Sequence, residues 1–123
     1  MKPILVPAIA LLLTTPALAL DTSMQVVLQL DGNAERNITK YQCDGVDEPL
    51  TVEYINASPT FLAFMPIEDQ KLIFVSVLAA SGAKYASGQY VWWTKGANAE
   101  LYDLTQGEDA KPTMTCLEAT ETP

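Results

Sequence analysis

Short β-prone segments separated by turn residues occupy most of the chain, and this spacing is the feature that most restricts its fold. Runs rich in branched and aromatic residues alternate with Gly, Pro, Asn and Asp, which is typical of an antiparallel sandwich or barrel. We expect about eight strands, within residues 24–30, 38–43, 50–54, 61–65, 72–80, 88–95, 99–104 and 114–117. Residues 72–80 also fit a partly helical segment, because a continuous apolar run does not distinguish the two.

The first 19 residues have the features of a secretory signal peptide. Lys2 is their only charge, residues 4–13 are apolar, and Ala17-Leu18-Ala19 matches a small-x-small cleavage site. The apolar run is too short to span a bilayer. We expect cleavage after Ala19, which leaves residues 20–123 as a single domain. No second long apolar segment follows in the sequence, so we expect the exported domain to be soluble, without a membrane anchor.

The two cysteines, Cys43 and Cys116, lie 73 residues apart in the sequence. In an exported chain an even pair of cysteines predicts a disulfide. An intermolecular bridge and two free thiols are the alternatives. A zinc site is disfavoured, because the sequence has no histidine and no second cysteine pair. We expect no metal and no cofactor.

The charge balance is strongly acidic. The chain has 15 acidic and seven basic residues, and the signal peptide contains one of the basic ones. Nucleic acid is therefore an improbable partner, since no basic patch is available to displace counterions. A basic macromolecule is a natural partner, because opposite net charges speed the encounter. Acidity that serves only solubility explains the same composition equally well.

An aromatic strand between two small-residue turns is the candidate recognition feature. Trp92 and Trp93 are adjacent, so on a strand one ring must face the core and the other a surface. A large exposed aromatic between a Gly-containing turn and Lys95 indicates a recognition edge. A well-packed hairpin with one partly covered ring is the alternative.

The residues present favour a binding protein over an enzyme. The absence of histidine removes most general-base and triad mechanisms, and the cysteines are expected to be in a bridge. A serine such as Ser81 on a tight turn would need a base to act as a nucleophile. Its hydroxyl can instead stabilise the turn or be presented to polar groups of a partner.

Several blocks of the sequence together carry a resemblance to a known family. The most specific are Ser81-Gly82-Ala83-Lys84-Tyr85, a Ser-Gly-x-x-Tyr motif, and the aromatic segment that ends at Trp93-Thr94-Lys95-Gly96. Further matches lie at residues 41–44, 49–52 and 99–102 and at Cys116. With these blocks in this order, the chain resembles the bacterial inhibitors of C-type lysozyme, whose members are membrane-bound or periplasmic. Residues 56–70 fit the resemblance least well.

The resemblance implies a fold, a function and a site. It implies a small antiparallel β-barrel of about eight strands with a Cys43–Cys116 bridge. It also implies a non-enzymatic inhibitor that inserts loops into the substrate cleft of lysozyme and so protects peptidoglycan. Ser81 and Lys95 are implied to face the lysozyme active site. The expected lysozyme-binding residues are Ser81, Gly82, Lys84, Tyr85 and Lys95, of which Tyr85 could act by holding its loop.

One departure from the family bears on location. Membrane-bound members have a lipid-modified cysteine at the processing site, whereas this chain has Leu20-Asp21 there. The resemblance therefore implies the soluble periplasmic form.

Two other functions fit the strand pattern. A small-ligand-binding barrel of the lipocalin type would need an apolar internal cavity, whereas a barrel of this size is mostly filled by its own side chains. An exported hydrolase could use a pair of the acidic residues. The oligomeric state cannot be inferred from the sequence.

Overall fold

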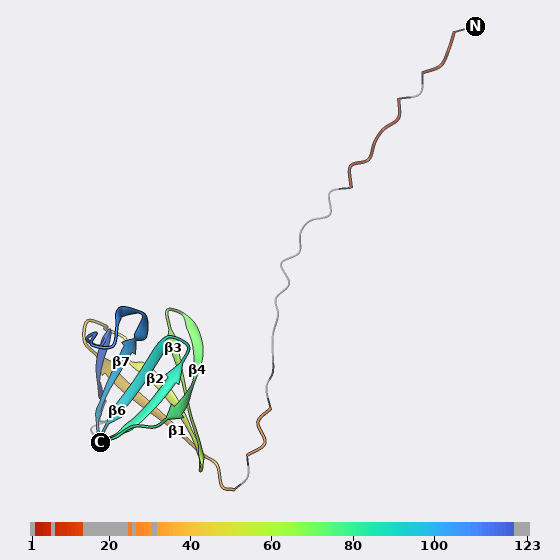
Figure 1. The fold of residues 1–123 in the computed structure, drawn as a ribbon. Coiled ribbons are helices and arrows are strands. Elements are labelled where there is room, and N and C mark those ends of the chain that lie inside the picture. Colours follow the sequence, from red (N-terminus) through yellow and green to blue (C-terminus); the bar gives the residue numbers. More distant parts are fainter. Residues whose placement is uncertain (1, 6, 14–24, 26, 31, 120–123) are drawn as a thin grey trace.

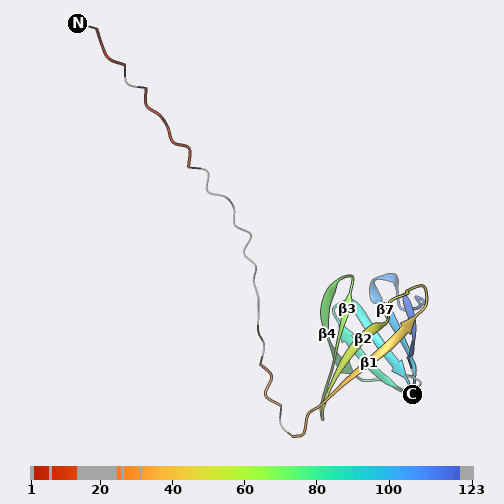
Figure 2. The same ribbon diagram turned by 180° about the vertical axis from the view of Figure 1, so that it is seen from behind.

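Eight strands close into one antiparallel barrel (Figure 1). The structure is a computed structural model that describes residues 2–5, 7–13, 25, 27–30 and 32–119. In chain order the strands are β1 Glu35–Cys43, β2 Leu50–Ala57, β3 Thr60–Ile67, β4 Gln70–Val77, β5 Ala83–Ser87, β6 Tyr90–Lys95, β7 Asn98–Asp103 and β8 Met114–Glu118. Each strand pairs with the next, and β8 returns to pair with β1 (Figure 2). The predicted all-β class is confirmed, and of the sandwich and the barrel the barrel is the correct alternative.

The first predicted strand is wrong. The described part of residues 24–30, which is residues 25 and 27–30, forms no strand, and the side chain of Val27 is 84% exposed. Apolar content alone does not make this segment a strand, because it pairs with no strand of the barrel and Leu28 is also left exposed. The predicted cleavage site at Ala19 lies outside the described residues.

One real strand was missed by the prediction. The sequence predicts no strand at β5, because four of its five residues are small or polar and Gly82 and Gly88 lie on either side. The neighbouring strands supply what its own sequence lacks, since β5 pairs with both β4 and β6. Pairing on both sides thus outweighs weak strand propensity.

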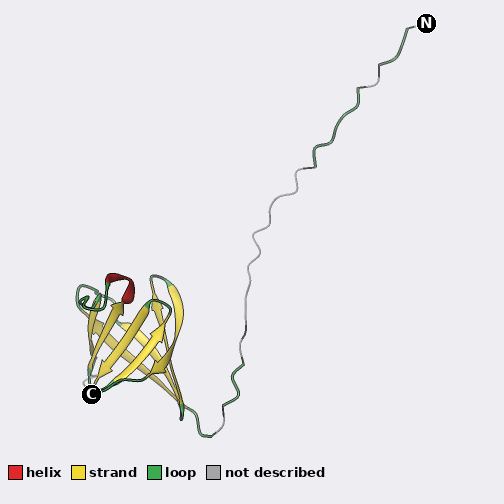
Figure 3. Cartoon of the chain, in the orientation of Figure 1, coloured by secondary structure: helices red, strands yellow, loops and turns green. Residues whose placement is uncertain are grey.

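The structure also adds detail to three segments of the predicted pattern. The segment predicted at 72–80 is the strand β4, with no helical part. β3 continues through Pro66, which lies one residue from the strand end, where one missing N–H costs little. The polar loop after β7 begins with a 3-10 helix, Leu104–Gln106 (Figure 3), whose first turn is capped by the carboxylate of Asp103.

Large side chains fill the barrel interior. Trp92, Phe74, Met65 and Val52 are fully buried. The ring of Trp92 meets that of Tyr41 edge-on, with centroids 5.3 Å apart. These side chains occupy the interior that a lipocalin-type ligand would need, so they argue against that alternative.

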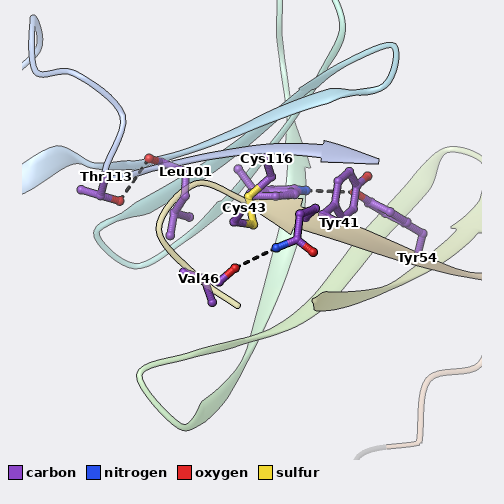
Figure 4. The surroundings of a disulfide bond; sticks show 9 residues. Tyr41, Cys43, Val46, Tyr54, Leu101, Thr113 and Cys116 are labelled. Atoms are coloured by element: carbon purple, nitrogen blue, oxygen red, sulfur yellow. Dashed lines mark hydrogen bonds between the residues drawn. A yellow bond between two sulfur atoms is a disulfide. The ribbon is translucent and has the colours of Figure 1, made fainter. Parts of the chain in front are cut away.

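A short hydrogen-bond chain links three polar side chains of the core (Figure 4). The indole N–H of Trp92 donates to the hydroxyl of Tyr54 at 2.9 Å, and the hydroxyls of Tyr54 and Tyr41 lie 2.7 Å apart. Burial raises the pKa of the Tyr41 and Tyr54 hydroxyls, because a tyrosinate there would lose its hydration. Both groups therefore stay neutral, and the core contains polar atoms without an unpaired charge.

The disulfide closes the seam between the first and the last strand. Cys43 of β1 and Cys116 of β8 are direct partners in the strand register and are bonded to each other, as predicted (Figure 4). In the chain-entropy model, a bridge that closes a loop of 73 residues stabilises the fold by roughly 4 kcal/mol.

Candidate functional site

Two connections at one end of the barrel bring the predicted site residues together. In an up-and-down barrel, alternate connections lie at the same end, so the β4–β5 loop and the β6–β7 turn are neighbours. Ser81 and Gly82 immediately precede β5, and Lys95 is the last residue of β6. The pair Ala83 and Thr94 joins the two strands next to these residues. We call residues 81–85 and 93–96 the loop edge.

Gly82 packs directly against the end of β6. Its φ of +66° lies in the left-handed region that favours glycine. A Cβ at this position would overlap the carbonyl oxygen of Thr94 and lie 2.8 Å from Cγ of Lys95. The small residue of the Ser-Gly-x-x-Tyr motif thus lets the loop carrying Ser81 touch the strand carrying Lys95.

Trp93 contacts three parts of the loop edge. Its indole N–H donates to the backbone carbonyl of Ser81 at 2.8 Å. The ammonium groups of Lys84 and Lys95 lie 4.0 and 3.9 Å from the centroid of its ring. Both distances are within the range of a cation–π attraction. One half-buried ring therefore links the loop, strand β5 and the end of strand β6.

The structure divides the predicted site residues into two groups. Ser81, Gly82 and Lys95 are exposed, and Lys84 is partly exposed on the outer face of β5. Tyr85 points into the barrel, where it is 6% exposed and its ring centroid lies 5.7 Å from that of Tyr54. Burial raises the pKa of the Tyr85 hydroxyl.

The expectation for the adjacent tryptophans is confirmed. Trp92 is fully buried in the barrel, and Trp93 is half-buried on the outer surface, where its ring lies near that of Tyr102. Sequence reasoning placed one ring outside but missed what that ring contacts. The register pair Lys84 and Trp93 creates the contact, and the sequence alone does not give this register.

Charge is distributed as discrete groups and not as a metal-binding cluster. Among the described residues, no group of three His, Cys, Asp or Glu side chains is arranged to hold a metal ion. The ion pair found in this part of the chain joins Arg36 to Glu53, with Nε and Oε1 2.6 Å apart. That arginine lowers the pKa of the Glu53 carboxyl through their hydrogen bond. No helix in the described segments has the length and apolar character needed to span a membrane.

The fold and the loop edge together define a class of protein: a small disulfide-closed barrel that presents a hydroxyl and an ammonium on a preorganised edge. This arrangement suits binding, since the groups are exposed and anchored from behind. The sequence model of the family described as membrane-bound lysozyme-inhibitor of c-type lysozyme matches residues 41–110. The chain belongs to this family.

Two relatives with the same family name agree with that assignment. The membrane-bound lysozyme inhibitor of C-type lysozyme of Pseudomonas aeruginosa is 39% identical over 72% of this chain and 69% of its own length. The protein of the same name from Cupriavidus necator is 42% identical over 65% of this chain and 63% of its own length.

Solved structures share the barrel. The structure of Pseudomonas aeruginosa MliC in complex with hen egg white lysozyme has a TM-score of 0.65 and 33% identity, covering 82% of this chain and all of that one. PliC-St, the periplasmic lysozyme inhibitor of C-type lysozyme from Salmonella typhimurium, has a TM-score of 0.56 at 24% identity, covering 69% of this chain and 99% of that one. The second similarity concerns the fold alone.

Proposed function

We propose that this protein inhibits C-type lysozyme, and that it does so by inserting the loop edge with Ser81 and Lys95 into the substrate cleft. The observation that carries the proposal is the junction at Gly82, which places the loop with Ser81 against the strand end with Lys95. The MliC relative crystallised with hen egg white lysozyme supports the choice of partner.

The chemistry of the two groups suits the target. Lysozyme cleaves glycans with a pair of carboxyl groups, which offer oxygen atoms as hydrogen-bond acceptors in its cleft. A serine hydroxyl and a lysine ammonium both donate hydrogen bonds, and the ammonium forms the stronger, charge-assisted kind with a carboxylate. Occupation of the cleft would exclude the glycan, so no reaction of the inhibitor itself is required.

Rigidity of the loop edge favours tight binding. Ordering a flexible loop on association subtracts from affinity. Here Gly82 packs on β6, Trp93 donates to Ser81, and the ring of Tyr85 is held in the core. Tyr85 thus supports the loop from inside the barrel, whereas Ser81, Gly82, Lys84 and Lys95 are available to a partner.

Net charge would speed the encounter. The whole chain has a formal net charge of −8, and loss of Lys2 with the signal peptide makes the exported part more acidic. An acidic inhibitor attracts a basic enzyme over distances of about one Debye length, roughly 8 Å at physiological ionic strength. We expect the association rate to fall as salt is added, and a rate independent of salt would reject this steering argument.

We further propose that the inhibitor acts in the periplasm as a soluble protein after loss of residues 1–19. The relatives named above as membrane-bound differ on this point, so the anchor needs a direct test. Leu20-Asp21 in place of a lipid-modified cysteine supports the unanchored form. Fractionation of producing cells should place the protein in the osmotic-shock fluid, and labelling with a radioactive fatty acid should leave it unlabelled. Recovery in the membrane pellet, with label, would contradict the proposal.

The deciding experiment is a lysis assay. Suspensions of bacterial cell walls lose turbidity when hen lysozyme is added, and the exported protein should slow this loss in a dose-dependent manner. An invertebrate-type lysozyme provides a comparison for selectivity. Unchanged lysis at a large molar excess of the protein would refute the proposed function.

A further inference from the structure

The environment of Lys95 contains a nearby carboxylate that does not pair with it. Glu100 is the register partner of Trp93, so it lies diagonally across β6 and β7 from Lys95. Trp93, Lys95, Asn98 and Glu100 line one small surface hollow. Nevertheless, within residues 32–119 the ammonium of Lys95 has no carboxylate within ion-pair distance.

Tyr102 engages the competing carboxylate. Tyr102 and Glu100 lie two residues apart on the same outer face of β7, and the tyrosine hydroxyl donates a hydrogen bond to Oε2 of Glu100. This bond raises the pKa of Tyr102 to about 12, so the hydroxyl remains a donor at physiological pH. The carboxylate is thereby directed toward Tyr102.

Trp93 holds the ammonium itself. Its ring attracts the Lys95 ammonium at 3.9 Å without neutralising the charge, whereas an ion pair with Glu100 would neutralise it. The N–H of the same ring fixes the Ser81 carbonyl. A single side chain therefore sets the position of both groups of the loop edge.

We propose that Trp93 and Tyr102 are positioning residues that keep Lys95 unpaired and aimed at the partner: Trp93 holds the ammonium, and Tyr102 withholds the Glu100 carboxylate from it. The inference rests on the proposed function in one respect, namely that Lys95 meets lysozyme. Its premise about the free protein, the location of the ammonium, can be measured without lysozyme.

A rescue cycle tests the role of Tyr102. In Tyr102→Phe the released Glu100 should pair with Lys95 and weaken inhibition by about two- to fivefold, the range of an exposed ion pair that must be broken on binding. Tyr102→Phe combined with Glu100→Gln should restore inhibition, because no carboxylate remains to compete. Tyr90→Phe is the matched control and should have no effect. Full inhibition by Tyr102→Phe, or failure of the double variant to recover, would overturn this part.

A graded series tests the role of Trp93. Trp93→Phe keeps an aromatic face but loses the N–H, whereas Trp93→Leu loses both. We expect Trp93→Leu to weaken inhibition by about tenfold, and Trp93→Phe to fall between it and the wild type. Equal inhibition by all three proteins would overturn the role. Near-ultraviolet circular dichroism of the buried Trp92 reports whether each variant is folded.

Proton NMR of the free protein separates the inference from the proposed function. The methylene protons of Lys95 next to Nζ should be shifted upfield by the Trp93 ring, and this shift should vanish in Trp93→Leu. A normal shift in the wild type would refute the inference, whatever the inhibition data. If the shift is present and Lys95→Ala inhibits like the wild type, the proposed role of Lys95 fails instead.

Discussion

The two adjacent tryptophans of β6 have different surroundings, although both use the same two features, the aromatic ring and the indole N–H. Trp92 packs its ring against Tyr41 inside the barrel and gives its N–H to Tyr54. Trp93 has its ring near two ammonium groups outside and gives its N–H to Ser81. In both cases the indole N–H donates a hydrogen bond and the ring packs against neighbouring groups. The side of the strand alone decides whether the tryptophan packs in the core or contacts the loop edge that we propose for recognition.

The largest expected effect is a difference in the free energy of unfolding between variants of the two tryptophans. Trp92→Ala should lower the free energy of unfolding by about 3–5 kcal/mol, because it leaves a large cavity in a filled core. Trp93→Ala should cost much less, since that ring is only half-buried. Urea denaturation of both variants provides the measurement. Equal losses would show that the inner and outer rings are not distinct in their contributions.

The second prediction concerns the loop edge. Ser81→Ala and Lys95→Ala should each weaken inhibition of lysozyme by roughly 1–3 kcal/mol, the range of interface anchors. Both side chains are exposed, so the unfolding curves should stay close to the wild type. Inhibition constants and melting curves are to be measured together. Lys111→Ala, an exposed lysine on the β7–β8 loop at the opposite end, is the control and should inhibit normally. A double Ser81→Ala, Lys95→Ala variant with wild-type potency would contradict the proposed site.

A third prediction tests the junction between loop and strand. Gly82→Ala should cost about 1–3 kcal/mol in stability or inhibition, because the new methyl group meets Thr94 in addition to the strained backbone. Gly88→Ala is a matched control, since Gly88 also has a positive φ but has open space around its Cβ direction. The excess cost at Gly82 measures the contact. Equal effects in the two variants would show that Gly82 is needed only for its positive φ and not for its close contact with Thr94.

The smallest expected effect is a loss of stability at high pH. A tyrosine whose pKa is raised in the fold contributes stability that is fully present below its unfolded pKa of about 10 and lost as the pH rises through the folded value. For Tyr102 that window runs from the unfolded value to about 12. Burial raises the pKa of Tyr41 as well, so the inner ring should ionise only when the barrel opens. Absorbance titration should show a reversible ionisation of an outer tyrosine in the wild type. The Tyr102→Phe variant should lack this ionisation.

The opposite orientations of the two tryptophans could be predicted from the sequence, because strand alternation is a local property. The disulfide and the candidate site residues could be predicted as well. Adjacent Trp92 and Trp93 had to face opposite ways, and two cysteines allow only one internal pairing. Ser81 and Lys95 were expected at the site through the Ser-Gly-x-x-Tyr and aromatic-strand motifs. Their proximity needed only that the two flanking strands be neighbours.

The errors have non-local causes. Residues 27–30 are as apolar as a strand, yet they pair with no strand of the barrel, and Val27 and Leu28 stay exposed. β5 has weak strand residues, yet two neighbours hold it. The contacts of Trp93 with Lys84, and of Tyr102 with Glu100, depend on register and rotamers. Such features are set by the assembled barrel, so local sequence does not contain them.

The bond between Cys43 and Cys116 also has a consequence for self-association. Each strand in the described barrel has two neighbours, but the pairing of β8 with β1 covers only Tyr41–Cys43 of β1. The Cys43–Cys116 bond holds this short pairing and so opposes opening of the barrel, which would expose further strand edges to another copy. We therefore expect a reducing agent to increase aggregation of the protein relative to oxidising conditions.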